Sequence, residues 1–315
     1  MLEQFPWLPP FRRKVAPNKQ SVASAFRRKF ETGHTVRVAR VPCHDSIMAA
    51  KIVLTSALIV ALCQSPTANI EVGGHCVALY DTSKATEWRT DEEACAVRLS
   101  PASTFKIPHA LIALETGAIK GDTIEKWDGQ RFSRQTAWEK DHDLQSAISN
   151  SVVWLFQRTA VRVGPASMKA WLQRFAYGNT DTSGDPVMYW LNGTLRISPS
   201  EQLEFLKRFF AGDLPVTSEH LTYVRQALAQ EPGTVRNSTG LHKVAAPWVN
   251  GTELQAKTGA TTAADGTSVS WLVGALNRDG HRHVFVSAVW RAGAVDPLDA
   301  SRQAMATFVE RGLLK

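Results

Sequence analysis

A serine and a lysine three residues apart are the strongest chemical signal in the sequence. Ser103 and Lys106 stand in the segment Ser103-Thr104-Phe105-Lys106, where the pattern predicts a helix over 104–116, and residues three apart on a helix share one face. A serine hydroxyl needs a neighbouring base, and a lysine is a base only if it does not remain an ammonium. By itself this spacing also fits a capping serine beside a solvated lysine, so further motifs must decide.

Two later segments supply groups that a serine nucleophile requires. Ser151 follows a helical stretch in Ser151-Val152-Val153, and Lys257-Thr258-Gly259 lies on a β-like segment. A second serine can pass a proton to a leaving nitrogen, and Lys257 brings positive charge to that relay and to a substrate carboxylate. Thr258 can donate to the same carboxylate, and Gly259 lets the substrate approach closely. Ser-x-x-Lys followed by Lys-Thr-Gly is typical of serine β-lactamases and penicillin-binding proteins.

The elements that must position these residues are segregated along the chain. Strands are predicted near both ends, whereas residues 120–230 have a mostly helical pattern. The predicted strands are 76–81, 85–88, 253–259, 267–276 and 283–290, with a turn at 277–280, and the clearest helices are 104–116, 198–211 and 297–311. This order predicts an α+β fold, with an antiparallel sheet flanked by terminal helices and an inserted helical region.

The composition excludes a disordered or collagen-like chain. The 315 residues are 44% hydrophobic and 21% charged, with 36 basic and 29 acidic side chains and a net charge of +7. Nine of the basic and only three of the acidic residues fall in 1–47, whereas 69–315 has 26 of each. We therefore expect no nucleic-acid partner, because such binding would require the basic extension to be retained.

The segment 48–68 has the three parts of a secretory signal peptide. It begins at Met48, has one basic residue, Lys51, then an apolar run from Ile52 to Leu62, and ends in small and polar residues at Ala68. That run is shorter than the ~17–25 residues of a membrane-spanning helix; the alternative is a buried core helix. We predict a basic upstream extension at 1–47 that is absent from the mature protein, and a periplasmic domain at 69–315 with no stable membrane span.

The sequence resembles the class D (oxacillinase-type) serine β-lactamases over roughly 76–311. Ser-Val-Val at the second motif differs from the Ser-Asp-Asn of class A enzymes. The segments that carry the resemblance are PASTFKIP at 101–108, Ser151-Val152-Val153, Tyr177-Gly178-Asn179, Tyr189-Trp190-Leu191, LRIS at 195–198, QLEFL at 202–206, Lys257-Thr258-Gly259 and Arg302 in SRQA.

The resemblance implies the fold of penicillin-binding transpeptidases and a particular base. Carbon dioxide would carboxylate Lys106 to N6-carboxylysine, so carbon dioxide or bicarbonate is required and no other cofactor is expected. Burial against Val153, Leu191 and Phe105 would keep the amine neutral, and the Trp190 indole would donate to the carbamate. The backbone N–H groups of Ser103 and Ala260 would form an oxyanion hole. Arg302 would bind the substrate carboxylate, unless it is an ordinary surface arginine.

Three positions depart from common family residues without removing a group that the mechanism needs. His109 stands where asparagine is common, Tyr189 where phenylalanine is frequent, and Ala260 offers a methyl where many relatives have an aromatic side chain. These differences leave the substrate spectrum open.

Cysteine and histidine usage indicates no metal site. Cys76 and Cys95 are the cysteines of 69–315; they either form a disulfide, as suits an exported protein, or remain two partly buried thiols. His281 and His283 lie two apart on a strand without a third ligand, so we expect solvated side chains there.

The motifs together predict hydrolysis of penicillin-type β-lactams through an acyl-enzyme on Ser103. Two alternatives share this fold: a β-lactam sensor that acylates without rapid turnover, and a D,D-peptidase acting on cell-wall peptides. We expect a monomer or a homodimer.

Overall fold

A five-stranded antiparallel sheet carries the Lys-Thr-Gly motif and supports the helices that hold the other predicted site residues. The computed structural model describes residues 73–246 and 251–314, so the predicted extension at 1–47 and signal peptide at 48–68 lie outside the described residues. The strand order is β2-β1-β7-β6-β5, which leaves β5 at an edge. The strands are β1 (Gly74–Asp81), β2 (Thr86–Arg89), β5 (Thr252–Thr262), β6 (Thr267–Arg278) and β7 (His281–Ala292).

Two long strands near the chain end form the centre of this sheet. β6 and β7 are largely buried and contain several β-branched and aromatic residues, which favour extended backbone. They are joined at Asp279 and Gly280, which have φ of 50° and 79°. Positive φ at both central residues is the mark of a two-residue hairpin turn, and Asp-Gly is a favoured pair for it. The turn predicted at 277–280 is therefore tighter than expected.

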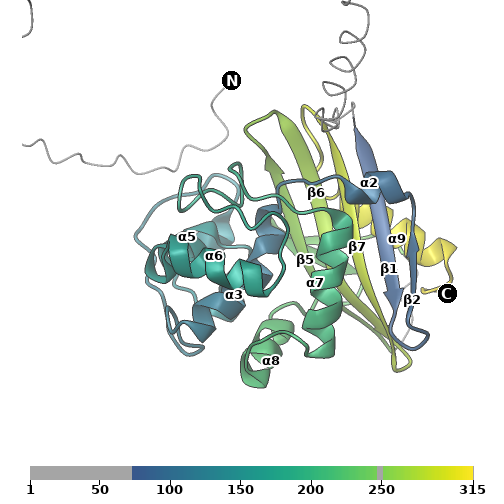
Figure 1. Cartoon of the computed structure of the whole chain (residues 1–315), viewed down its shortest axis with the longest axis horizontal. Coiled ribbons are helices and arrows are strands. Elements are labelled where there is room, and N and C mark those ends of the chain that lie inside the picture. The colour runs from purple at the N-terminus through teal and green to yellow at the C-terminus, as the bar shows by residue number, and fades with distance from the viewer. Residues whose placement is uncertain (1–72, 247–250, 315) are drawn as a thin grey trace, which may run out of the picture. The chain divides into compact units, whose positions relative to one another are not determined.

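Helices cover both faces of the sheet, so the predicted α+β class is confirmed (Figure 1). α9 (Asp299–Glu310) packs on one face, α7 (Pro199–Ala211) crosses the other, and the remaining larger helices gather beside β5. That group consists of α3 (Lys106–Glu115), α4 (Leu144–Ser149), α5 (Val153–Val163), α6 (Pro165–Arg174) and α8 (Ser218–Gln226).

The start of α7 follows its sequence signature closely. Ser198 accepts a hydrogen bond from the Glu201 N–H at 3.2 Å, and the Glu201 carboxylate accepts from the Ser198 N–H at 2.9 Å. This reciprocal pair is a capping box. The helix ends at Gly212, whose φ of 95° is left-handed.

Three elements differ from the sequence prediction. The helix expected over 104–116 is a 3₁₀ turn, η2 (Ala102–Phe105), followed by α3 from Lys106. A short helix, α2 (Glu92–Ala96), and a hairpin of β3 (Thr234–Asn237) and β4 (Gly240–Lys243) were not predicted. Segments this short and polar have too little apolar periodicity to be recognised.

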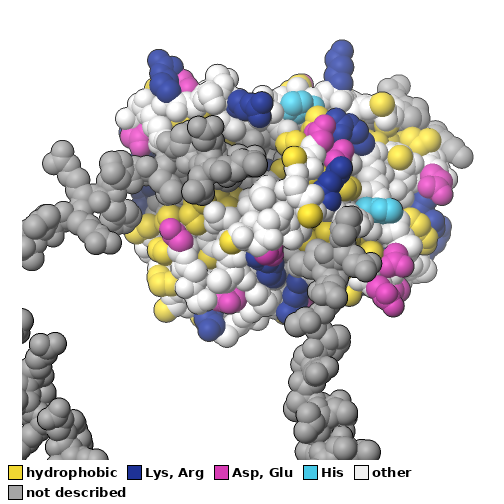
Figure 2. All heavy atoms as spheres, turned by 90° about the horizontal axis from the view of Figure 1, so that it is seen from above, with side chains coloured by type: hydrophobic (Ala, Val, Ile, Leu, Met, Phe, Trp, Pro, Cys, Tyr) yellow, Lys and Arg dark blue, Asp and Glu magenta, His cyan; other side chains and the backbone are white. Residues whose placement is uncertain are grey.

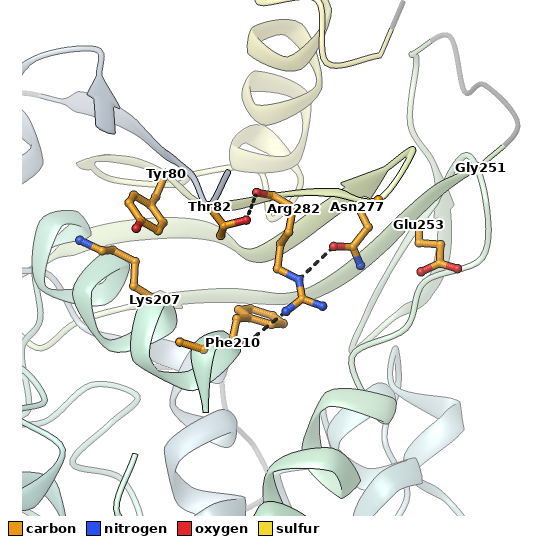
Figure 3. A pocket seen from close by; sticks show the side chains of 10 residues that line it. Tyr80, Thr82, Lys207, Phe210, Gly251, Glu253, Asn277 and Arg282 are labelled. Carbon is orange, nitrogen blue, oxygen red and sulfur yellow. Dashed lines mark hydrogen bonds between the residues drawn. The ribbon is translucent and has the colours of Figure 1, made fainter. Parts of the chain in front are cut away.

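An arginine on β7 holds the end of α7 against the sheet. The Arg282 guanidinium stacks on the Phe210 ring, 5.6 Å from its centroid, and donates to the Phe210 carbonyl at 3.2 Å and to Asn277 Oδ1 at 3.0 Å (Figure 3). These groups line a cavity of about 720 Å³, with Tyr80 and Lys207 on its other side. Ser103, Lys106 and Lys257 are not among its lining residues.

A disulfide joins β1 to α2. The Cα atoms of Cys76 and Cys95 are 5.2 Å apart, both side chains are buried, and 19 residues separate them in sequence. Of the helices that the structure describes, none is both long and apolar enough to cross a bilayer.

Replacing both Cys76 and Cys95 by alanine should lower the free energy of unfolding by about 3 kcal/mol, because a loop of this size restricts the unfolded chain by that amount. Thermal unfolding of the oxidised, reduced and doubly substituted proteins would test this. Equal melting temperatures for all three would show that the bridge does not stabilise the fold.

Candidate active site

Ser103 and Lys106 lie within hydrogen-bonding distance where the 3₁₀ turn meets α3. Lys106 Nζ donates to Ser103 Oγ at 2.9 Å. The 3₁₀ geometry brings residues three apart into line, since this helix has three residues per turn. Ala102, directly before the serine, has a φ of 49°, a left-handed conformation that costs a non-glycine residue energy and is often found at functional sites. The predicted serine–lysine pair is thus assembled.

The Lys106 amine is buried without a carboxylate partner. Its side chain is fully inaccessible, and Nζ lies 5.2 Å from the centroid of the Phe156 ring. Burial holds the pKa of Lys106 well below its usual value, and the nearby charge of Lys257 lowers it further. A neutral amine is a base and a nucleophile, which an ammonium is not.

Aromatic side chains form the wall around this lysine. Phe105 stacks on Trp190 at a centroid distance of 5.7 Å and contacts His109 at 5.4 Å and Tyr189 at 5.7 Å. His109 also meets Phe156 edge-on at 5.1 Å. These rings therefore keep water away from the Lys106 amine, whose side chain is fully inaccessible.

Ser100 holds the Trp190–Leu191 segment against the part of the chain that directly precedes the nucleophile. Its hydroxyl lies 3.0 Å from the Trp190 carbonyl and 2.6 Å from that of Leu191, and its own carbonyl accepts from the Trp271 indole at 2.9 Å. Leu191 and Val153, both expected beside Lys106, are buried. Ser100 was not singled out from the sequence, because a lone serine has no distinctive spacing.

A second serine–lysine pair lies on separate elements. Lys257 Nζ on β5 donates to Ser151 Oγ at 3.1 Å and to the Thr258 carbonyl at 2.9 Å. Ser151 follows α4 with a φ of 56°. Burial lowers the pKa of Lys257 to about 7, so this side chain can exchange a proton near neutral pH. The structure thus brings together the two residues proposed for the proton relay.

The backbone of β5 approaches the nucleophile closely. A Cβ at Gly259 would lie 3.2 Å from the backbone nitrogens of both Ser103 and Thr104, closer than such contacts normally are. The Ala256 N–H points away from β6, since it donates to the Leu228 carbonyl. Along an edge strand, the N–H groups point alternately towards the neighbouring strand and away from it. The N–H of Ala260, four residues after Ala256, therefore also points away from β6. It is thus available to an oxyanion beside Ser103.

Two proposed substrate contacts have partners within the protein. The Thr258 hydroxyl donates to the Arg236 carbonyl at 3.0 Å. Arg302 is more than half exposed and forms ion pairs with Asp296 and Asp299. Arg236 and the two aspartates were missed from the sequence, because only the fold brings them near the Lys-Thr-Gly strand.

No metal cluster accompanies the site in the described part of the chain. Residues 73–246 and 251–314 contain no group of three or more histidine, cysteine or acidic side chains that could hold a metal ion. On the face shown in Figure 2, basic and acidic side chains are interspersed.

Comparisons with known proteins agree with this geometry. Residues 59–309 match the family model of the penicillin-binding protein transpeptidase domain. The chain is 37% identical over 186 residues to β-lactamase OXA-48 of Klebsiella pneumoniae, a match that covers 56% of this chain and 70% of the relative. The chain belongs to the class D serine β-lactamases. It is also 43% identical to OXA-10 of Pseudomonas aeruginosa over 149 residues, which cover 46% of this chain and 55% of that protein.

Solved structures extend the similarity over the whole class D fold. The class D β-lactamase BAT-2 superposes with a TM-score of 0.63 at 30% identity, covering 77% of this chain and 93% of that one. The C-terminal domain of the Bacillus licheniformis BlaR penicillin receptor gives 0.67 at 26% identity, covering 78% and 92%. The fold is therefore shared by class D enzymes and by a receptor domain.

Replacing Lys106 by methionine should abolish activity and stabilise the fold. In carbon dioxide-free buffer at pH 7 the free energy of unfolding should rise by about 1–2 kcal/mol, because an apolar side chain needs no desolvation of a polar group. The gain should shrink towards pH 10, where the unfolded lysine binds fewer protons. Chemical denaturation would measure both effects. The exposed Lys126→Met is the control and should change stability little; a destabilised Lys106→Met would contradict this account.

The pH profile of kcat/KM should report the titration of Lys257 in the free enzyme. Its pKa of about 7 predicts that kcat/KM falls as the pH rises above 7 and the ammonium is lost. Lys257→Arg keeps its charge at high pH. In this variant the fall of kcat/KM should therefore occur at a higher pH, even if its activity is lower. An unchanged limb in this variant would assign the titration to another group.

Proposed function

We propose that this class D enzyme hydrolyses the lactam amide of penicillin-type antibiotics through an acyl-enzyme on Ser103. The observation that carries the proposal is the 2.9 Å hydrogen bond between Ser103 Oγ and Lys106 Nζ inside a buried, apolar pocket. A serine paired with a neutral base is the arrangement that nucleophilic attack requires.

In acylation, Ser103 Oγ attacks the lactam carbonyl and loses its proton to the base on Lys106. The tetrahedral oxyanion is stabilised by the N–H groups of Ser103 and Ala260. When the carbon–nitrogen bond breaks, the leaving nitrogen takes a proton from Ser151, which Lys257 restores through their 3.1 Å contact. Water then attacks the ester and frees Ser103.

Carboxylation of Lys106 would supply the base for both halves of the reaction. The neutral amine attacks carbon dioxide, a carbon–nitrogen bond forms and one proton is released. The pocket suits the product, because the Trp190 indole N–H and the Tyr189 hydroxyl are buried donors with no hydrogen-bond partner among the described residues. Two carbamate oxygens would provide acceptors, and unpaired buried donors are otherwise costly.

Lys257, Thr258 and Arg302 are the proposed contacts of the substrate carboxylate. Lys257 and Thr258 lie on β5, and Gly259 allows the substrate to reach that strand. Arg302 is on α9 and carries its charge at any working pH.

We place the mature protein in the periplasm, after removal of the predicted signal peptide. The disulfide of Cys76 and Cys95 supports an oxidising compartment, where such bonds persist.

Nitrocefin turnover by the purified domain tests the proposal. Steady hydrolysis that is lost in Ser103→Ala supports it, whereas one equivalent released without turnover would indicate a sensor.

Carboxylation of Lys106 is tested by removing carbon dioxide. Degassing at low pH should reduce activity and bicarbonate should restore it, because carboxylation is reversible. Trp190→Phe should need more bicarbonate for half-maximal activity. Full activity without any bicarbonate response, together with an active Lys106→Ala, would refute the carbamate but leave the acyl-enzyme standing.

A further inference from the structure

The guanidinium of Arg302 is held between two carboxylates of its own chain. Arg302 Nη1 donates to Asp299 Oδ1 at 2.9 Å, and Nη2 donates to Asp296 Oδ2 at 2.8 Å. Both terminal nitrogens therefore already bind the kind of group that a β-lactam carboxylate would offer. The three side chains are partly exposed, at 57% for Arg302, 48% for Asp296 and 23% for Asp299.

Further contacts fix both carboxylates in this position. Asp299 Oδ2 accepts from Arg291 Nη2 at 2.6 Å and from the Asp296 N–H at 3.2 Å. Asp296 Oδ1 accepts from the Leu298 N–H at 2.9 Å. Each aspartate thus uses one oxygen to order its own segment and the other to bind Arg302, so the ion pairs are built into the start of α9.

This group lies beside β6, the strand that pairs with the Lys-Thr-Gly strand β5. Ser270 on β6 is the register partner of Ala260 on β5. The Ser270 hydroxyl donates to the Pro297 carbonyl at 2.9 Å and accepts from the Ala300 N–H at 3.2 Å. The segment that contains Asp296 and Asp299 is therefore fastened one strand away from the proposed oxyanion hole.

The β3–β4 hairpin contacts the Lys-Thr-Gly strand directly, since its Arg236 carbonyl accepts the Thr258 hydroxyl at 3.0 Å. The Leu298 N–H and then the Arg302 guanidinium hold the pKa of the Asp296 carboxyl below its usual value. Asp296 is therefore an anionic partner of the arginine that is expected to bind substrate.

We propose that Asp296 and Asp299 determine specificity by competing with the substrate carboxylate for Arg302. The inference rests on the proposed hydrolysis of β-lactams. A substrate must displace the Asp296 carboxylate or add a third negative charge around one guanidinium, and like charges at this distance repel. Asp296 is the partner to be displaced, because it lies in the loop before α9 and is the more exposed of the two.

The consequence is weak selection for the ring carboxylate. Asp296, Asp299, Arg291 and Arg302 together have no net charge, so the group adds little long-range attraction for an anionic substrate. Asp296→Asn keeps the shape and the Leu298 contact but removes one competitor and leaves the group with a charge of +1.

The test compares a penicillin with its carboxylate methyl ester. Asp296→Asn should raise kcat/KM for benzylpenicillin about three- to fivefold, the scale of one exposed ion pair, with kcat unchanged and no gain for the ester. In the Ser103→Ala background, the Kd of benzylpenicillin should fall by the same factor. Asp213→Asn, which removes an exposed charge in the loop after α7, should alter neither value.

The double variant Asp296→Asn/Arg302→Ala decides whether the effect passes through Arg302. The proposal requires that the gain disappear in this variant and that Arg302→Ala alone raise KM for benzylpenicillin. An unchanged or higher KM in Asp296→Asn, an equal gain for the ester, or a gain that survives loss of Arg302 would overturn it. Turnover of nitrocefin by the unmodified enzyme, lost in Ser103→Ala, separates these results from failure of the proposed hydrolysis.

Discussion

Burial of one amine determines how the remainder of this molecule must be built. Lys106 is fully inaccessible and its only hydrogen-bond partner among the described residues is Ser103. An ammonium in that position would be strongly disfavoured, so the pocket selects the neutral form that a base or a carbon dioxide acceptor must have. The aromatic wall of Phe105, Phe156 and Trp190 excludes water and thereby maintains this state. The packing that buries Lys106 therefore also keeps its amine in the reactive neutral form. The enzyme gives up stability to keep this polar group in its core.

Two chain segments with left-handed backbone support this arrangement. Ala102 precedes the nucleophile and Ser151 is the relay serine, and both have φ near 50°. The strain is tolerated because each segment is fixed on both sides: the Ala102 segment by Ser100 and its bonds to the Trp190 loop, and the Ser151 segment by α4 and α5. The two serines thus hold their positions before any substrate arrives, which is the preorganisation that catalysis by fixed groups requires.

The sequence was sufficient to predict the class of fold and the residues of the two serine–lysine pairs. Long apolar strands and the Ser198 capping box are local patterns with a direct physical cause, and the structure has them within a few residues of their predicted bounds. The 3₁₀ turn at Ala102–Phe105 was not predictable, because β5 packs against this turn from a position more than 150 residues away. The ion pairs of Arg302 were missed for a similar reason: their geometry depends on where α9 is fastened to Ser270. Local propensity describes elements well, whereas contacts between remote elements follow only from their assembly.

The position of β1 in the sheet controls the order in which this protein can assemble. β1 is built from residues near 80, yet its neighbour towards the sheet centre is β7, built from residues near 285. The central pairing therefore closes a loop of about 200 residues, and such long-range contacts form slowly because their closure entropy is large. A chain emerging from the ribosome cannot complete the sheet, nor bring β5 against Ser103 on a finished frame, until its last strand is available. The sheet thus remains incomplete until nearly all of the described chain has been synthesised.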